Sequence, residues 1–595
     1  MSDVPVAGPV CALADLFTDQ QAWEAALDEL RGLLDEVAPE PPGDGVALLV
    51  WLQAVDGLQR RQGRLSTYMG IQSFVDGRAS EPQRHAARLR ESGAAIGQRL
   101  AAFNALLVLT DEAAWAQWLH VEPGLGVYVG RYRSLRAGRQ HVLAGEVERA
   151  LAALDTSLQL PVQLYRRIKA GDLRFAEVED AAGVRWPFSL SRFEKRFETS
   201  PDARLRASAA RVFADGVSAH RHAFAAAYAG EVSRQVSLAR LRGFSDTLDL
   251  LFWQQGIDRA FFEAQRAVFN QGLAPLMRRF IEVKRRLLGL PKLAFHDLKA
   301  YPPQIPGEVS FDFARKAILA AGQALGDDYA DVLRRAFDER WVEHGQQPNK
   351  ADSSGCASPF GPHPYVLMTW TGSPRDMFLL AHELGHAVHF HWSAEHQAVL
   401  NAAPLRYFIE APSTLNELLL AAHLLRSDDA AQRLSAVFEL LNSYYHNFVT
   451  HYLESEFQVR VYHQADAGSL LGAEALERIK TLVLRDFWGD AVDIDDTAGL
   501  TWLRQQHYYM GLYPYTYAAG QSIASLYQVR LASDPQAAER WCAALRQGSS
   551  IDAATLLQQL DLDMRDGAAF RAVLGLIDGH VTQLEQLAQP YFSEE

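Results

Sequence analysis

Two histidines spaced four residues apart, with a glutamate directly after the first, are the residues best suited to chemistry. The segment reads His382-Glu383-Leu384-Gly385-His386. Residues four apart lie on one face of an α-helix, so both imidazoles can point at one metal ion. Glu383 is the next residue round the helix, where its carboxylate can reach a water bound to that ion. A zinc ion held in this way lowers the pKa of its water, and the carboxylate can take the proton as the water attacks a carbonyl.

The sequence around these histidines predicts a strand followed by a helix with a defined start. Residues 375–391 are mostly good helix formers, and Ser373 and Pro374 suit the N-cap and the first helical position. Residues 365–371 are β-branched and aromatic, and Pro364 before them predicts an edge strand. Such a strand could hold an extended peptide by β-augmentation, or it could only pack against the helix.

A catalytic zinc site needs a third protein ligand, and the sequence offers a carboxylate. The pattern HExxHxxGxxH fails, because residue 389 is His and residue 392 is Trp. Glu410 lies at the start of a following predicted helix among apolar neighbours, where an unpaired charge is costly, and this favours a ligand role. Glu417 lies two turns further along the same face and could accept the second ring N–H of a ligand histidine. His389 is interpreted as a structural or pocket histidine.

A second informative stretch lies at residues 506–520. Phenol and imidazole donors can bind the oxyanion that forms when water attacks a peptide carbonyl. An aromatic core element is the alternative, although several buried hydroxyl groups would then need partners. We therefore expect this stretch to form part of an active site. Its donors are His507, Tyr508, Tyr509, Tyr513, Tyr515 and Tyr517.

Composition is that of a soluble globular protein with more than one lobe. The chain has 595 residues, of which 48% are hydrophobic and 22% charged. The net charge of −14, without a long basic run, argues against nucleic-acid binding. The N-terminus lacks the features of a signal peptide, and the apolar stretch at residues 46–52 is too short to span a membrane. Cys11, Cys356 and Cys542 are far apart, which fits a reducing, cytoplasmic setting without disulfides.

Apolar residues recurring three and four apart predict a mostly α fold, with a small β-sheet beside the helix that carries the two histidines. A hairpin is expected at residues 180–188, near the end of an N-terminal helical lobe over residues 1–195. The catalytic domain is expected over residues 196–595. The first long helices are expected at residues 20–38, 45–68 and 81–108.

These motifs, in this order, resemble those of the thimet-oligopeptidase/oligoendopeptidase F family of zinc peptidases, and are more similar to its oligoendopeptidase F branch. The similarity of motifs covers roughly residues 350–525. It implies two helical lobes that enclose a deep channel, and endopeptidase action on short peptides, because a narrow channel excludes folded proteins. The matching segments are residues 363–372, 376–386, 409–417, 507–509 and 513–520.

By motif position, the resemblance implies that His382, His386 and Glu410 bind one Zn²⁺ per chain. Glu383 would be the general base, and Glu417 would support a ligand histidine from behind.

The resemblance further implies that His507 and nearby tyrosines stabilise the transition state. Among the tyrosines, Tyr513 and Tyr515 are favoured over Tyr508 and Tyr517.

The sequence therefore predicts a cytoplasmic zinc endopeptidase that hydrolyses short peptides in peptide turnover, without nucleic-acid or membrane partners. One alternative is a metallocarboxypeptidase on a similar helical scaffold, which would need a cationic group for the substrate carboxylate. Another is a non-catalytic peptide-binding homologue, against which the intact Glu383 counts.

Overall fold

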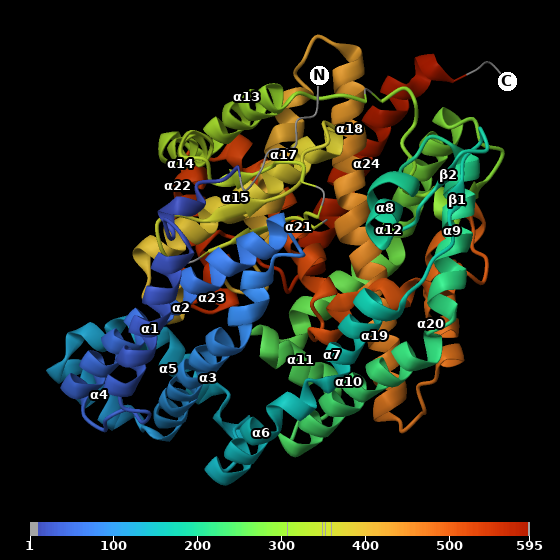
Figure 1. The fold of residues 1–595 in the computed structure, drawn as a ribbon. Helices are drawn as coiled ribbons and strands as arrows, with labels where there is room; N and C mark the ends of the chain where they lie inside the picture. Colours follow the sequence, from blue (N-terminus) through green and yellow to red (C-terminus); the bar gives the residue numbers. More distant parts are fainter. Residues whose placement is uncertain (1–9, 306, 348, 352, 359, 593–595) are drawn as a thin grey trace. The chain divides into compact units, whose positions relative to one another are not determined.

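The computed structural model describes residues 10–305, 307–347, 349–351, 353–358 and 360–592. Most of these residues are helical and the sheets are small, which confirms the predicted mostly α fold (Figure 1). The first nine residues, where no signal peptide is expected, lie outside the described part. The deep channel and the division at residue 195 stay predictions.

The chain divides into two compact units, each assembled from three separate stretches. Unit 1 comprises Met1–Val142, Glu308–His423 and Tyr527–Leu562. Unit 2 comprises Leu143–Gly307, Leu424–Leu526 and Asp563–Glu595.

Unit 1 contains helices and one small sheet. Its strands are β4 (Val342–Glu343), β5 (Gly355–Ala357) and β6 (Tyr365–Leu367). Its helices are α1 (Gln20–Glu36), α2 (Gly45–Val75), α3 (Ser80–Leu109), α4 (Glu112–Val121), α5 (Val129–Ala137), α13 (Phe311–Gly322), α14 (Asp327–Asp338), α15 (Pro374–His396), α16 (Val399–Ala402), α17 (Glu410–Leu424), α22 (Ala537–Leu545) and α23 (Ala553–Gln559).

Unit 2 contains helices and two short strand pairs. The strands are β1 (Val178–Glu179), β2 (Arg185–Trp186), β3 (Leu293–Ala294) and β7 (Val492–Asp493). The helices are α6 (Gly145–Leu158), α7 (Leu160–Arg167), α8 (Leu190–Arg192), α9 (Ala203–Ser218), α10 (Arg221–Leu241), α11 (Thr247–Gln255), α12 (Arg259–Leu287), α18 (Ala430–Tyr444), α19 (His451–Asp466), α20 (Ala473–Trp488) and α24 (Gly567–Ala588). Helix α21 (Pro514–Ser533) runs through the division between residues 526 and 527.

Short 3₁₀ and π segments occur in both units. The π segments are η4 (Ile168–Asp172), η5 (Phe193–Phe197) and η8 (Tyr445–Thr450). The 3₁₀ segments are η1 (Leu13–Asp15), η2 (Pro123–Tyr128), η3 (Arg139–His141), η6 (Phe295–Asp297), η7 (Gln323–Leu325), η9 (Gly489–Ala491), η10 (Ala498–Arg504), η11 (Gln506–Tyr509) and η12 (Gln589–Tyr591).

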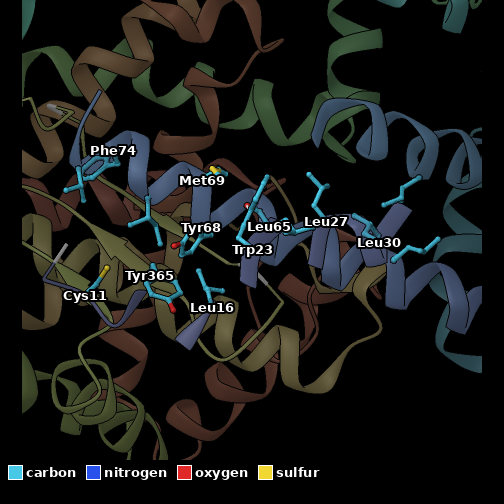
Figure 2. Packing of buried hydrophobic residues seen from close by; sticks show 14 of the residues in the cluster. Cys11, Leu16, Trp23, Leu27, Leu30, Leu65, Tyr68, Met69, Phe74 and Tyr365 are labelled. Atoms are coloured by element: carbon cyan, nitrogen blue, oxygen red, sulfur yellow. The ribbon is translucent and has the colours of Figure 1, made fainter. Parts of the chain in front are cut away.

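A hydrophobic cluster in unit 1 joins the N-terminal helices to the sheet. Asp19 is the N-cap of helix α1, and its side chain accepts a hydrogen bond from the Ala22 N–H, an otherwise unpaired donor. The apolar face that follows repeats every three to four residues, as predicted, and packs against α2 and β6. The cluster includes Trp23, Leu27 and Leu30 of α1, Leu65 and Tyr68 of α2, and Tyr365 of β6 (Figure 2).

The strand before the histidine helix is central in its sheet, so the predicted edge strand is wrong. The strand order is β4-β6-β5, with β6 parallel to β4 and antiparallel to β5. Pro364 stands one residue before the first paired position, Tyr365, and therefore removes no hydrogen bond from the ladder. The strand is also shorter than predicted, ending at Leu367, and β5 lies at an edge of the sheet.

The other predicted elements are present. The three long N-terminal helices form as α1, α2 and α3, and the predicted hairpin forms as antiparallel β1 and β2, with Val178 opposite Trp186. In unit 2, α12 packs along α24, and Arg279 of α12 pairs with Glu585 at 2.8 Å (Figure 1).

One helical stretch, Arg84–Leu109 in α3, is long and apolar enough to cross a bilayer by length and composition alone. Core helices meet the same criterion, and α3 packs against α2 and α5. The criterion is therefore weak evidence, and the expected absence of a membrane partner stays a prediction.

Helices α15 and α17 approach each other closely at Gly385. A Cβ atom at Gly385 would lie 2.5 Å from Ser413 Cα and 2.6 Å from the Pro412 carbonyl oxygen. Both neighbours are backbone atoms, so they cannot rotate away as a side chain could. The missing side chain of Gly385 is therefore what allows the first turn of α17 to lie against the histidine helix.

We expect Gly385→Ala to lower the free energy of unfolding by about 1–3 kcal/mol, because the added methyl group overpacks the contact. Thermal unfolding of the metal-free protein measures this effect. The matched control is Gly70→Ala in α2, where a Cβ atom meets nothing within 4 Å. That change should leave the melting temperature unchanged or raise it slightly. A Gly385→Ala variant as stable as the Gly70→Ala variant would contradict the close contact.

Candidate metal centre and active site

The start of α15 is fixed as the sequence predicted. Ser373 is the N-cap, Pro374 is in the first turn, and Asp376 completes a capping box with Ser373. Asp376 also accepts hydrogen bonds from the N–H and the hydroxyl of Thr371, at 2.7 and 2.6 Å. This rigid start sets the rotation of the helix and therefore the direction of the side chains one to three turns later.

The structure brings His382, His386 and Glu410 together in unit 1. The two imidazole rings lie one helical turn apart, with centroids separated by 5.0 Å. Glu410 is the first residue of α17, and its Oε2 lies 3.3 Å from the Nε2 atom of each histidine. One ligand atom from each of the three residues lies within 4.8 Å of the others.

This arrangement fits a tetrahedral metal ion. Zinc with ligands at about 2.0–2.1 Å separates neighbouring ligand atoms by about 3.3 Å, and two of the separations here have that value. Two imidazole nitrogens and one carboxylate oxygen also form a donor set suited to zinc at a catalytic site. Asn416 helps to hold the two helices together, because its side-chain amide donates to the Ala381 carbonyl oxygen at 3.1 Å.

The charges at this cluster support one another. Burial alone would raise the pKa of Glu410, but the adjacent His386 and His382 rings hold it well below its usual range. Burial would lower the pKa of His382, yet hydrogen bonds to Glu410 and Glu417 raise it to about 10. Both groups are therefore stabilised in their charged forms in the metal-free protein.

Glu417 lies where the sequence predicted a supporting carboxylate. Its Oε1 is 2.8 Å from His382 Nδ1, which leaves His382 Nε2 directed at Glu410. Its other oxygen, Oε2, is 3.4 Å from Arg375 Nη1. A chain of contacts thus runs from Arg375 through Glu417 to His382 and fixes the orientation of the ring.

Glu383 is buried beside the sheet edge. Its side chain is 5% exposed and forms a hydrogen bond with Ser354. Its negative charge also helps to raise the pKa of the Cys356 thiol in β5. Burial is the main reason that the pKa of Glu383 is raised, with Glu410 adding to the effect against the two histidines. A raised pKa brings a carboxylate closer to the range useful for accepting and returning a proton.

His389 is not part of the three-residue cluster. It is 1% exposed, and its ring packs edge-on against Phe408 at 5.7 Å. Burial, with a contribution from His386, lowers its pKa to about 3, so the ring is neutral. These surroundings match the structural role interpreted from the sequence.

In unit 2, His507 is joined by Tyr513 and Tyr517. The His507 ring centroid lies 5.1 Å from that of Tyr513 and 5.7 Å from that of Tyr517, and the two tyrosine rings are 5.5 Å apart. Both tyrosines and His507 are partly exposed.

The other two tyrosines considered from the sequence point elsewhere. Tyr515 is 1% exposed and packs edge-on against Phe262, and Tyr508 is 1% exposed beside Phe457. The reason is helical periodicity: Tyr517 lies four residues after Tyr513, on the same side of the start of α21, whereas Tyr515 lies between them on the opposite side. The preference for Tyr515 over Tyr517 is therefore not supported by this arrangement.

Several residues that lie beside the candidate site residues were not identified from the sequence. Arg375 lies seven residues, or two helical turns, before His382, and this spacing could have indicated that the two residues share a face of α15. In unit 2, His446, His451 and Glu454 gather beside Tyr517, a cluster signalled by two histidines and a glutamate within nine residues.

The sequence matches the models of known peptidase families. The model of peptidase family M3 matches residues 196–576, and the model described as oligopeptidase F matches residues 107–175. The chain is 24% identical over 587 residues to oligopeptidase PepF of Bacillus subtilis, covering 97% of this chain and 86% of the relative. It is 21% identical to an oligoendopeptidase F homolog of Lactococcus lactis, covering 97% of each.

A solved structure has the same fold. Oligoendopeptidase F from Enterococcus faecium superposes with a TM-score of 0.74 at 21% identity, covering 96% of this chain and 99% of that structure. The family model spans well over half of the chain and confirms the resemblance seen in the motifs. The chain therefore belongs to peptidase family M3 and is a metalloendopeptidase.

Proposed function

We propose that the protein is a zinc-dependent oligopeptidase that hydrolyses internal peptide bonds of short peptides. The observation that carries the proposal is the placement of Glu410 Oε2 3.3 Å from both His382 Nε2 and His386 Nε2. Family membership supports a metal-dependent peptidase, and the names of the relatives support short peptides as substrates.

His382, His386 and Glu410 would hold the ion, and Glu417 would keep the His382 ring oriented. When bound, a zinc ion supplies Lewis acidity, which polarises a peptide carbonyl and lowers the pKa of water. Zinc is the proposed ion because two imidazoles and one carboxylate, with ligand separations near 3.3 Å, match its catalytic sites.

Glu383 would act as the general base and then as the general acid. Its carboxylate would accept a proton from the attacking water and return it to the nitrogen of the leaving amine. The raised pKa favours this shuttle, because it makes the carboxylate a stronger proton acceptor than an ordinary glutamate.

His507, Tyr513 and Tyr517 would bind the carbonyl oxygen as its negative charge develops. Imidazole N–H and phenol O–H groups are suitable donors, and donors fixed before the reaction stabilise charge without reorganisation. Tyr517 takes the place given to Tyr515 in the sequence analysis, because Tyr517 and not Tyr515 lies beside His507.

We propose a cytoplasmic location. Cys11, Cys356 and Cys542, all among the described residues, are free, as expected in a reducing compartment.

We expect Glu383→Gln to keep the metal and to lose about 10²–10⁴-fold in kcat, because the proton acceptor is removed while the ligands stay. The assay uses an internally quenched peptide blocked at both ends, which a carboxypeptidase cannot cleave. Glu410→Ala should instead lose metal during dialysis, and Glu395→Gln, an exposed position on the same helix, should change neither property. Activity close to that of the wild type in Glu383→Gln would show that Glu383 is not the general base.

We expect metal binding to the metal-free protein at pH 8 to release about one proton per ion, because a histidine must be neutral to bind a metal. The source is His382, whose pKa of about 10 keeps its ring protonated at that pH. Metal affinity should therefore rise as the pH increases toward 10. Titration calorimetry in two buffers of different ionisation enthalpy measures the proton count. Glu417→Gln should reduce the number of protons released, since it removes a carboxylate that raises the pKa of His382. The same binding heat in both buffers would mean that no proton is released and would contradict a protonated His382.

We expect Tyr517→Phe to lower kcat about 10²-fold with little change in KM, because it removes a donor used mainly in the transition state. Tyr515→Phe is the matched control and should keep most of the activity. Steady-state kinetics on the blocked peptide separates the two parameters. Equal losses in both variants would mean that the side of α21 on which a tyrosine lies does not decide its role.

A further inference from the structure

A buried glutamate in unit 2 lies beside the residues proposed to bind the substrate carbonyl. Glu454 belongs to the first turn of α19 and is 6% exposed. One of its carboxylate oxygens lies within 4.8 Å of a ring nitrogen of His507. A buried carboxylate is costly unless its charge is stabilised, so the groups that contact it indicate its role.

The first contact of Glu454 orients an imidazole against Tyr517. Glu454 Oε2 is 2.8 Å from His451 Nδ1, and because a carboxylate only accepts hydrogen bonds, Nδ1 carries a proton. The His451 ring is 3% exposed and stacks on Tyr517, with centroids 4.0 Å apart and an angle of 11° between the rings. Fixing the imidazole therefore fixes the surface on which the Tyr517 ring lies.

A π-helical segment supports His451 at its other nitrogen. Segment η8 (Tyr445–Thr450) leads into α19, and the His451 N–H donates to the His446 carbonyl oxygen, five residues back. In an α-helix, residues five apart point about 140° away from each other. The wider π turn instead places them on one side, and the Nε2 atoms of His446 and His451 lie 3.3 Å apart. The His451 ring is thus held at both nitrogens and on one face.

The second contact of Glu454 leads to the backbone of His507. Gln505 forms a hydrogen bond with Glu454, and its Oε1 accepts a hydrogen bond from the His507 N–H at 3.2 Å. Because the carboxylate only accepts, the Nε2 group of Gln505 is the one that faces Glu454. Gln505 is also the N-cap of η11, the segment that carries His507. The carboxylate therefore fixes the direction of the amide that caps this segment.

Glu454 meets both contacts as an ionised group. Burial alone would raise its pKa, but the neighbouring His451 and Lys480, together with the hydrogen bond from Gln505, lower it to about 2. An ionised carboxylate offers one acceptor oxygen to each of its two donors. An amide in its place would offer one oxygen and would direct an N–H group at the other donor.

A second buried glutamate on α19 provides a contrast. Glu456 is 4% exposed, and its Oε1 lies 2.7 Å from Arg266 Nε. This ion pair joins α19 to α12. The two contacts of Glu454 lead instead to Tyr517 and His507.

We propose that Glu454 is a positioning residue that holds His507 and Tyr517 ready for the substrate carbonyl oxygen. It acts through Gln505 on His507 and through His451 on Tyr517. The inference rests on the proposed function, in which His507 and Tyr517 bind that oxygen. Donors fixed before the reaction stabilise the developing charge without reorganisation, and a small displacement of such a donor is costly in rate.

The first test is Glu454→Gln in the full-length holoenzyme, assayed on the peptide blocked at both ends. We expect kcat to fall about 10- to 100-fold with KM nearly unchanged, because the donors are displaced but remain present. Metal content should stay that of the wild type. The matched control, Glu456→Gln, should lower the melting temperature, since it breaks a buried ion pair, and should keep kcat close to that of the wild type.

Gln505→Ala tests the same connection at a partly exposed position, where a substitution is better tolerated than at Glu454. It removes the cap of the segment that carries His507 and leaves the pair of Glu454 and His451 in place. We expect kcat to fall about tenfold, again with KM nearly unchanged. Normal kcat in both Gln505→Ala and Glu454→Gln, or a loss that appears in KM instead of kcat, would overturn the inference.

A double-mutant cycle separates positioning from a general structural defect. In the background His507→Gln/Tyr517→Phe, the donors that Glu454 positions are already removed. Adding Glu454→Gln should therefore reduce kcat much less than it does in the wild type. A defect in folding or in the scaffold would reduce kcat by the same factor in both backgrounds, and that result would overturn the positioning role.

The inference and the proposed function can fail separately. Full activity in both His507→Gln and Tyr517→Phe would overturn their role at the substrate carbonyl, and the positioning role with it. Loss of activity in those two variants, with full activity in Glu454→Gln, would overturn only the positioning role.

Discussion

The candidate metal centre depends on the close contact between two helices at a glycine. Because Gly385 has no side chain, the backbone at Pro412 and Ser413 lies against α15, and Glu410 is brought to 3.3 Å from two imidazoles. A larger residue at that position would separate the carboxylate from the rings. The geometry of the site is therefore set by backbone packing as much as by its ligands.

Burial then determines the electrostatics. Three carboxylates, Glu383, Glu410 and Glu417, are each no more than 5% exposed, and buried charges are costly unless they are paired. Glu410 and Glu417 are paired with histidines, whereas Glu383 has a raised pKa. The difference separates a carboxylate suited to binding an ion, Glu410, and one suited to orienting a ligand histidine, Glu417, from one suited to moving a proton, Glu383.

The same combination of histidine and supporting carboxylate occurs in both units, on different backbones. In α15 an ordinary α-helical spacing of four aligns His382 and His386, whereas η8 needs a π turn to align His446 and His451 at a spacing of five. An α-helical spacing therefore predicts the first pair from the sequence and not the second. The five-residue spacing does not predict a shared face unless the π turn is already known.

The sequence by itself determined the mostly α fold and the capped start of α15, and it singled out His382, His386, Glu410 and Glu417 as the candidate site, because these follow from local spacing and helix signals. Tertiary structure decided what depends on contacts between distant segments. It placed the strand at Tyr365–Leu367 in the centre of its sheet, since β4 and β5 come from separate stretches of the chain. It also placed the Tyr517 ring beside His507 and the Tyr515 ring against Phe262, because the packing of α21 determines which of its sides faces His507.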